Sequence, residues 1–217
     1  MVINTEKCKV VMFNSGRKFD AMPKLTLPGM GENYLEVVES FKLLGVKITS
    51  DLKWKENTDY ICQKGYTKLW VLRRLKALGA TESELLDLYE KQVRSILELA
   101  VPVWQPALTL SESSQIERVQ KTAFCIILGD QYEHYENALN KLGHDRLSFR
   151  REKLCQKFAQ KCQKNPKYTN WFCKEIMGPS KPRFCKQKRN NQLKTVPTRT
   201  NRYENSPLPY LTKLLNQ

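Results

Sequence analysis

Acidic residues and long apolar runs are both scarce in this sequence. Asp and Glu total 22 against 37 Lys and Arg, which gives the 217 residues a formal net charge of +15. No run of about 18 apolar residues, the length that spans a bilayer as a helix, is present, so we expect no membrane partner. A positive field of this size attracts polyanions, and nucleic acid is therefore the expected partner.

The residues of common catalytic sites are also few. The two histidines, His134 and His144, show neither the spacing of a zinc-binding helix nor that of an iron-binding triad. There is no G-x-x-x-x-G-K-[ST] phosphate loop and no G-x-G-x-x-G cofactor turn. Two-metal phosphoryl transfer needs clustered carboxylates, and the sequence holds no Asp-Asp pair. We therefore expect no metal, no cofactor and no enzymatic activity from this chain alone.

Cysteine is present in an odd number and never as a C-x-x-C pair, which speaks against a zinc site. Residues 1–9 turn polar and charged almost at once, so no secretory signal is indicated. We expect an intracellular protein, cytoplasmic or nuclear, with reduced thiols that pack as small apolar groups. Cys155 and Cys162 are seven residues apart and are expected to share a helix face with Phe158.

Apolar spacing along the chain predicts short strands followed by helices. Residues 10–13 and 41–48 are β-prone and could pair with each other, with Gly45 at a bulge or a close backbone approach. Five amphipathic helices are expected over 54–79, 81–102, 111–129, 135–143 and 148–166. Thr81 and Glu84 have capping-box spacing, and the Ser111 and Ser148 hydroxyls can cap two later helices. Pro102 is expected to end the second helix.

The predicted fold class is mostly α, with three parts. Residues 1–50 form a small β-hairpin region, residues 51–177 a helical bundle, and residues 178–217 a basic, proline-containing tail. Residues 181–202 contain eight Lys or Arg and no Asp or Glu, so this segment is expected to stay flexible until an anion binds it. Residues 207–215 regain apolar side chains that could dock back onto the bundle.

Basic residues near aromatic ones are the candidate binding groups. Trp70, Arg73, Arg74 and Lys76 place one ring and three cations within two helical turns, a composition suited to phosphates and stacking. The competing interpretation is a solvated basic face with Trp70 in the core. The complete set of nucleic-acid-binding candidates is Lys64, Lys68, Trp70, Arg73, Arg74, Lys76, Arg118, Lys121, Lys186, Lys188 and Arg189.

Five blocks in order carry a resemblance to a known family. They read NTEKCKVVMF at 4–13, LEVVESFKLLGVKI at 35–48, LWVLRRL at 69–75, LAVPVW at 99–104 and IERVQK at 116–121. The chain thereby resembles the C-terminal third of reverse transcriptases, RNA-directed DNA polymerases, from non-LTR (LINE-like) retrotransposons. The resemblance covers nearly the whole chain.

That resemblance implies a role for each block. Residues 4–13 look like the end of the palm, with Lys7 matching a lysine that assists pyrophosphate departure in a complete enzyme. The helices after Trp54 look like the thumb, which follows the template–primer duplex. Cys8 and Gln105 depart from the family's usual Thr or Ser and His. The primer-grip-like residues are Phe41, Lys42, Leu43, Leu44 and Gly45.

The family's fingers and Tyr-x-Asp-Asp strand should precede Asn4, and Mg²⁺ would be bound only in the complete polymerase. The expectation is therefore a truncated fragment that binds RNA, DNA or an RNA–DNA duplex but does not polymerise. The missing fingers and palm are a further expected partner. A first alternative is a non-catalytic helical scaffold or interaction module. A remote alternative is the helical module attached to AlkB-type tRNA-modifying enzymes, around residues 43–76, without dioxygenase or methyltransferase motifs.

Overall fold

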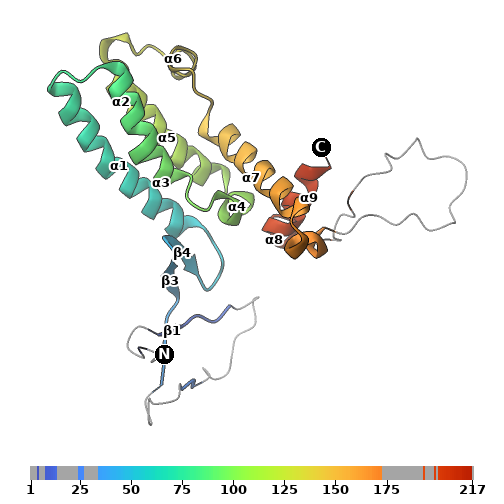
Figure 1. The fold of residues 1–217 in the computed structure, drawn as a ribbon. Helices are drawn as coiled ribbons and strands as arrows, with labels where there is room; N and C mark the ends of the chain where they lie inside the picture. The colour runs from blue at the N-terminus through green and yellow to red at the C-terminus, as the bar shows by residue number, and fades with distance from the viewer. Residues whose placement is uncertain are drawn as a thin grey trace, which may run out of the picture.

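The protein is mostly helical, as the sequence predicts (Figure 1). The structure is a computed structural model that describes residues 4, 8–13, 24–26, 34–172, 193, 198 and 200–216. A small β-hairpin lies at one end of the helical body and helix α6 at the other, and the C-terminal helices pack beside α7 (Figure 1). Lys7, Lys186, Lys188 and Arg189 lie outside the described residues.

The expected pairing of residues 10–13 with 41–48 is wrong. Strand β1 (Lys9–Val10) pairs in parallel with β2 (Glu36–Val37), whereas β3 (Ser40–Leu43) and β4 (Val46–Thr49) form an antiparallel hairpin. Leu44 and Gly45 have φ of 47° and 91°, and positive φ at both central residues is the geometry of a two-residue hairpin turn. The segment 41–48 therefore folds onto itself.

Gly45 lies at a close approach, one of the two roles expected for it. A Cβ at this position would lie 2.8 Å from Cδ2 of Leu99. The hairpin is joined to the helical body by the backbone N–H of Lys47, which donates to Oδ1 of the buried Asn57 at 3.1 Å. Val46 is buried in the main core. The hairpin is thus seated on the start of the first helix.

Helix α1 (Lys55–Ala77) packs alongside α5 (Leu110–Leu128) in the same direction. The amide of Gln115 donates to Asp59 at 2.9 Å near the start of both helices. Halfway along, Gly65 faces Val119, and near the end Lys76 reaches the Ile126 carbonyl. Gly65 has no side chain to hold the two helices apart, and its contact with Val119 shows how closely they approach.

The second predicted helix is more interrupted than expected. The capping box of Thr81 and Glu84 is confirmed at the start of α2 (Glu82–Leu88). A π-helical turn (Tyr89–Arg94) and α3 (Ser95–Leu97) follow, and the helix ends before Ala100, whose φ is 52°. The expected stop at Pro102 is wrong, because Pro102 lies in the first turn of α4 (Val101–Trp104), where its missing N–H costs nothing. A 3-10 turn (Gln105–Ala107) comes next.

Two predicted caps are replaced by other residues. Helix α5 starts from Thr109, which forms a capping box with Glu112, and not from Ser111. At the start of α7 (Leu147–Lys164), the side chain of Ser148 makes no capping bond. Instead the Glu117 carboxylate accepts the backbone N–H groups of Leu147 and Ser148 at 3.0 and 3.1 Å. The stops of α5 at Gly129 and of α6 (Tyr135–Leu142) at Gly143 are confirmed.

The last residues return to the helical body. A 3-10 segment (Pro166–Trp171) follows α7, and the chain resumes as α8 (Asn201–Glu204) and α9 (Pro207–Leu215). Leu211 and Leu214 of α9 are buried, and α9 packs against α7. The docking of residues 207–215 is therefore confirmed.

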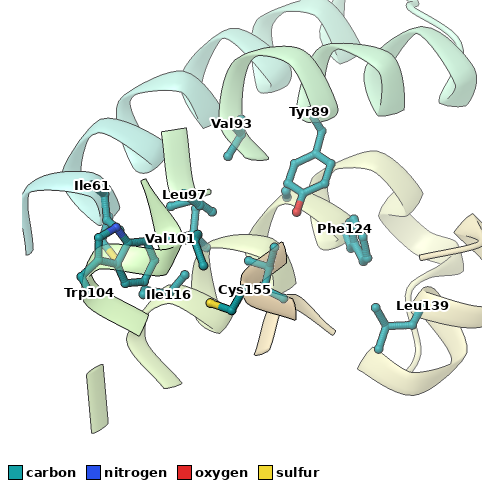
Figure 2. Close-up of a cluster of buried hydrophobic side chains, with 14 of the residues drawn as sticks. Ile61, Tyr89, Val93, Leu97, Val101, Trp104, Ile116, Phe124, Leu139 and Cys155 are labelled. Atoms are coloured by element: carbon teal, nitrogen blue, oxygen red, sulfur yellow. The ribbon is translucent and has the colours of Figure 1, made fainter. Parts of the chain in front are cut away.

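One hydrophobic core joins the helices (Figure 2). Its largest fully buried side chains include Trp104, Tyr89 and Phe124, with the Tyr89 and Phe124 rings edge to face at 5.3 Å. Cys155 and Cys162 are buried with Cys62, as predicted for thiols in the core, whereas Cys125 is exposed and does not fit that prediction. Phe158, however, is exposed, so the expected shared face is only partly correct.

Candidate nucleic-acid interface

One side of α1 is exposed and carries aromatic and basic residues. The residues buried on the opposite side, such as Ile61, Leu69 and Leu72, fix the orientation of the helix. Positions three or four residues apart share a helix face. We name as the α1 stripe the residues at such steps on the outer side: Tyr60, Lys64, Thr67, Trp70 and Arg74.

Trp70 is exposed to 59%, which excludes the interpretation that places it in the core. The guanidinium of Arg74 lies over its ring, 5.4 Å from the centroid. A large ring that is left in solvent, with a cation beside it, is the arrangement on which a nucleic-acid base stacks. Arg73 is exposed one position away, on the flank of the stripe.

The cations near this stripe have no acidic partner among residues 34–172. Of the ion pairs that the structure describes, those on α1 involve only its first turns, where Lys55 pairs with Asp59 at 3.0 Å. Elsewhere some of the described pairs link neighbouring turns of a helix, as Lys91 and Asp87 do at 2.8 Å, and others join separate segments, as Lys153 and Asp145 do at 2.8 Å. Lys64, Lys68, Arg73 and Arg74 are therefore uncompensated charges, available to an anionic ligand.

The hairpin brings two more lysines to the start of the stripe. Nζ of Lys42, Lys47 and Lys64 lie 5.0, 5.5 and 4.7 Å from the centroid of the Tyr60 ring. We name this group the Tyr60 cage. The ammonium groups of Lys42 and Lys64 lower the pKa of the Tyr60 hydroxyl. Sequence reasoning placed Lys42 and Lys64 in different candidate sets and left Lys47 out, because their meeting depends on the hairpin's position over α1.

Lys76 was predicted to bind nucleic acid, but in the structure its side chain makes a contact between two helices. Its Nζ donates to the carbonyl oxygens of Ile126 and Ile127, at 2.5 and 3.0 Å, in the last turn of α5. Those carbonyls have no partner within their own helix, and a cation there also interacts favourably with the helix dipole. Lys76 therefore holds α1 and α5 together and is removed from the candidate interface.

The other predicted residues lie apart from the stripe. Arg118 and Lys121 are exposed on α5, with Nζ of Lys121 over the Tyr135 ring at 4.9 Å. Within the primer-grip-like segment 41–45, Phe41 is half-buried and Leu44 is 91% exposed at the hairpin tip. Only Lys42 of that segment joins the Tyr60 cage.

A second basic and aromatic surface was missed by the sequence reasoning. On α7, Lys153 lies over the exposed Phe149 ring at 4.2 Å, and Lys157, Lys161 and Lys164 continue along the exposed side. The spacing of three or four residues between these lysines was visible in the sequence. Lys153 pairs with Asp145 at 2.8 Å, so this surface is partly compensated, unlike the α1 stripe.

A pocket of about 560 Å³ opens between the start of α1, the start of α5 and α8. Its lining includes Lys53 and Lys55. Both are in ion pairs, with Asp51 at 3.3 Å and Asp59 at 3.0 Å. The pocket therefore lacks the uncompensated charge that distinguishes the Tyr60 cage.

Gln105, which stands where the resembling family often has His, supports a buried arginine. Arg151 is fully buried on α7, and its Nε and Nη2 donate to Gln105 Oε1 and Ser113 Oγ at 2.7 Å each. Burial lowers the pKa of this guanidinium. Gln105 thus has a structural contact in the core region, away from the exposed stripe.

Comparison with known proteins found no match: no family model, no curated protein and no solved structure matches the chain. Within the described ranges, no three His, Cys, Asp or Glu side chains lie close enough together to hold a metal ion. No helix in the part of the chain that the structure describes has the length and apolar character needed to cross a membrane.

Proposed function

We propose that this chain is a nucleic-acid-binding, non-polymerising part of a reverse transcriptase of the non-LTR type. Its α1 stripe contacts the sugar–phosphate backbone and stacks on a base. The observation that carries the proposal is the exposed Trp70 ring beside the cations Arg73 and Arg74, which have no acidic partner within residues 34–172. The order of the five sequence blocks supports the choice of family.

Binding of this kind should be electrostatic and should not depend on base sequence. Each phosphate contact releases counterions, so affinity for an oligonucleotide falls steeply as salt rises. Stacking on Trp70 adds affinity for unpaired bases, because every base has a face that can stack. We therefore expect single strands of RNA or DNA to bind, with little difference between sequences of equal length.

The test measures fluorescence anisotropy of labelled oligonucleotides with hydroxyl ends at increasing salt. Trp70→Ala should weaken single-strand binding about tenfold, the size of one lost base stack. The double variant Arg73→Ala/Arg74→Ala should lower the log–log salt slope by about 1.4, two single-strand phosphate contacts. The α7 double variant Lys157→Ala/Lys161→Ala is the matched control and should change neither value.

Two results would overturn the proposal. If the α7 variant loses affinity and the α1 variants do not, the interface lies on α7 and the proposed α1 stripe is not the binding surface. If the protein ignores RNA and DNA at low salt, or extends a primer unaided, its function is different.

An interaction module is the second candidate, and one observation favours it. Leu44 at the hairpin tip is 91% exposed, and Leu43, Leu99 and Val103 are also exposed. The contact between Gly45 and Leu99 places the hairpin tip beside this part of the helical body. Sedimentation of the protein and of Leu44→Ser tests it: a Leu44-dependent oligomer, together with no oligonucleotide binding, would favour this candidate.

A further inference from the structure

The Tyr60 cage concentrates like charges at a cost to the fold. Lys42 and Lys47 are direct partners across the hairpin, and Lys64 meets them from α1. Like charges directly opposite each other destabilise a hairpin. The Tyr60 ring offsets part of that cost by cation–π attraction. The remainder is unfavourable unless an anion joins the three ammonium groups.

No acid of the described segment 34–172 forms an ion pair with these lysines. The acidic residue next to the cage in the sequence is Asp59, and its carboxylate accepts from Lys55 at 3.0 Å and from Gln115 at 2.9 Å. Lys55 on α1 is thus neutralised by Asp59, whereas Lys64 on the same helix has no such ion pair in the described segment. Besides Gln115 and Lys55, Lys47 lowers the pKa of Asp59 from a longer range, so Asp59 also attracts Lys47. The charges of Lys42 and Lys64 are therefore the part of the cage most available to a ligand.

The phenol of Tyr60 adds a hydrogen-bond donor at the centre of the cage. Its oxygen is covered from solvent, and the neighbouring ammonium groups of Lys42 and Lys64, which lower the pKa of the hydroxyl, can only donate to it. The phenol proton therefore has no acceptor among the described residues, which costs free energy that a bound acceptor would recover. An oxyanion between the ammonium groups can accept from the phenol O–H and from the lysine N–H groups together.

We propose that Lys42, Lys47 and Lys64 form, around Tyr60, a binding site for a phosphate group. This rests on the proposed function, because the phosphate belongs to a nucleic-acid strand. Tyr60 and Trp70 are ten residues apart on one helix, about 15 Å. A strand held by a phosphate at the cage can therefore run along the α1 stripe and stack a base on Trp70.

Charge favours a terminal phosphate over one inside the strand. A phosphate monoester carries about −1.5 to −2 charges at neutral pH, and a backbone diester carries one. Three ammonium groups around one ring match the monoester better. The ligand expected in the cage is thus the phosphorylated end of a strand.

The experiment compares one single-stranded oligonucleotide with a 5′-phosphate, with a 3′-phosphate and with hydroxyl ends, by fluorescence anisotropy with the full chain. A terminal phosphate should tighten binding about tenfold or more, the effect of one net hydrogen bond to a charged group. The double variant Lys42→Gln/Lys64→Gln should remove that preference. The charge-matched control is Lys141→Gln/Lys161→Gln, which removes two lysines away from the cage, on α6 at the far end of the body (Figure 1) and on α7, and should keep that preference.

Other results separate the two phosphate sources. Equal loss of affinity for all three oligonucleotides in the double variant supports the cage as a site for a backbone phosphate. No effect of the double variant on any of them overturns the proposal.

A second readout does not depend on nucleic acid. Inorganic phosphate should shift the NMR signals of Tyr60 and of the three lysine side chains, relative to chloride at equal ionic strength, in wild type but not in Lys42→Gln/Lys64→Gln. A shift without oligonucleotide binding would uphold the site and refute the proposed function. Oligonucleotide binding through Trp70 without a phosphate-induced shift would uphold the proposed function and refute the phosphate site.

Discussion

Lys76 and Arg74 are two residues apart on α1, and the fold gives them different roles. Lys76 donates to two carbonyl oxygens at the end of α5, those of Ile126 and Ile127. Arg74 is exposed, and its guanidinium lies over the exposed Trp70 ring, 5.4 Å from the centroid. The first interaction stabilises the packing of two helices, and the second leaves a cation exposed to a ligand.

These roles predict opposite effects for matched substitutions. Lys76→Met should lower the free energy of unfolding by about 1–2 kcal/mol, because two helix-terminal carbonyls lose a charged donor. Arg74→Met should change it by less than about 0.5 kcal/mol, as most surface substitutions do. Urea unfolding followed by circular dichroism measures both.

Oligonucleotide affinity should respond in the reverse order, lower for Arg74→Met and unchanged for Lys76→Met. The division of roles is wrong if both variants have the same stability. The sequence alone could not distinguish the roles of these two cationic residues, because the partner of Lys76 is 50 residues away along the chain.

At the level of elements, the contact between α1 and its neighbours depends on Gly65. A Cβ there would lie 2.9 Å from Val119 Cγ1 and 3.4 Å from Leu97 Cδ2. The missing side chain lets α1 approach α5 and α3 closely. This approach also holds the α1 stripe outward, because the side opposite Gly65 must face solvent.

Gly65→Ala should therefore destabilise the protein by about 1 kcal/mol. Alanine gains about 1 kcal/mol of helix propensity, and overpacking costs about 1–3 kcal/mol. Adding Val119→Ala should recover part of the loss, so a double-mutant cycle should show coupling between the two positions. If the single variant Gly65→Ala is more stable than wild type, the interface between α1 and α5 can accommodate a methyl group without strain.

Local signals explain which elements the sequence predicted well. The Thr81–Glu84 capping box and Gly143 each act within one helical turn, so their pattern is readable along the chain. The break at Ala100 has positive φ at a residue that is neither Gly nor Asn, so nothing in the local sequence predicts it. The capping of α7 by Glu117 depends on residues brought together only by folding. The same limit applies to the site, because the exposure of Trp70 and the meeting of three lysines at Tyr60 depend on the tertiary structure.

At the scale of the whole molecule, carboxylates tie separate elements together. The Gln115 amide on α5, and then Lys55, lower the pKa of Asp59 on α1. Burial alone would raise the pKa of Glu90 on the π-helical turn, but Arg94 and His144 together outweigh it and the pKa is lowered. His144, whose Nε2 lies 2.8 Å from the Glu90 carboxylate, follows α6 and so links two parts of the chain. Asp59 and Glu90 are thus more easily ionised in the folded chain than in the unfolded one.

The sign of the pH dependence follows from these lowered values. The stabilisation is complete above the unfolded-state carboxyl pKa of about 4 and is lost as pH falls through the lower folded-state values, because the unfolded chain then binds more protons. The urea midpoint should stay nearly constant from pH 7 to about 5 and fall between about pH 4 and 3.

Growing positive charge also destabilises the protein in acid, since the chain already carries +15 at pH 7. The double variant Asp59→Asn/Glu90→Gln isolates the carboxylate contribution: it should be less stable than wild type at pH 7, and the difference should shrink as pH falls towards 3. A difference that stays constant over that range would mean that neither carboxylate is linked to folding, and that acid acts on this basic molecule through repulsion alone.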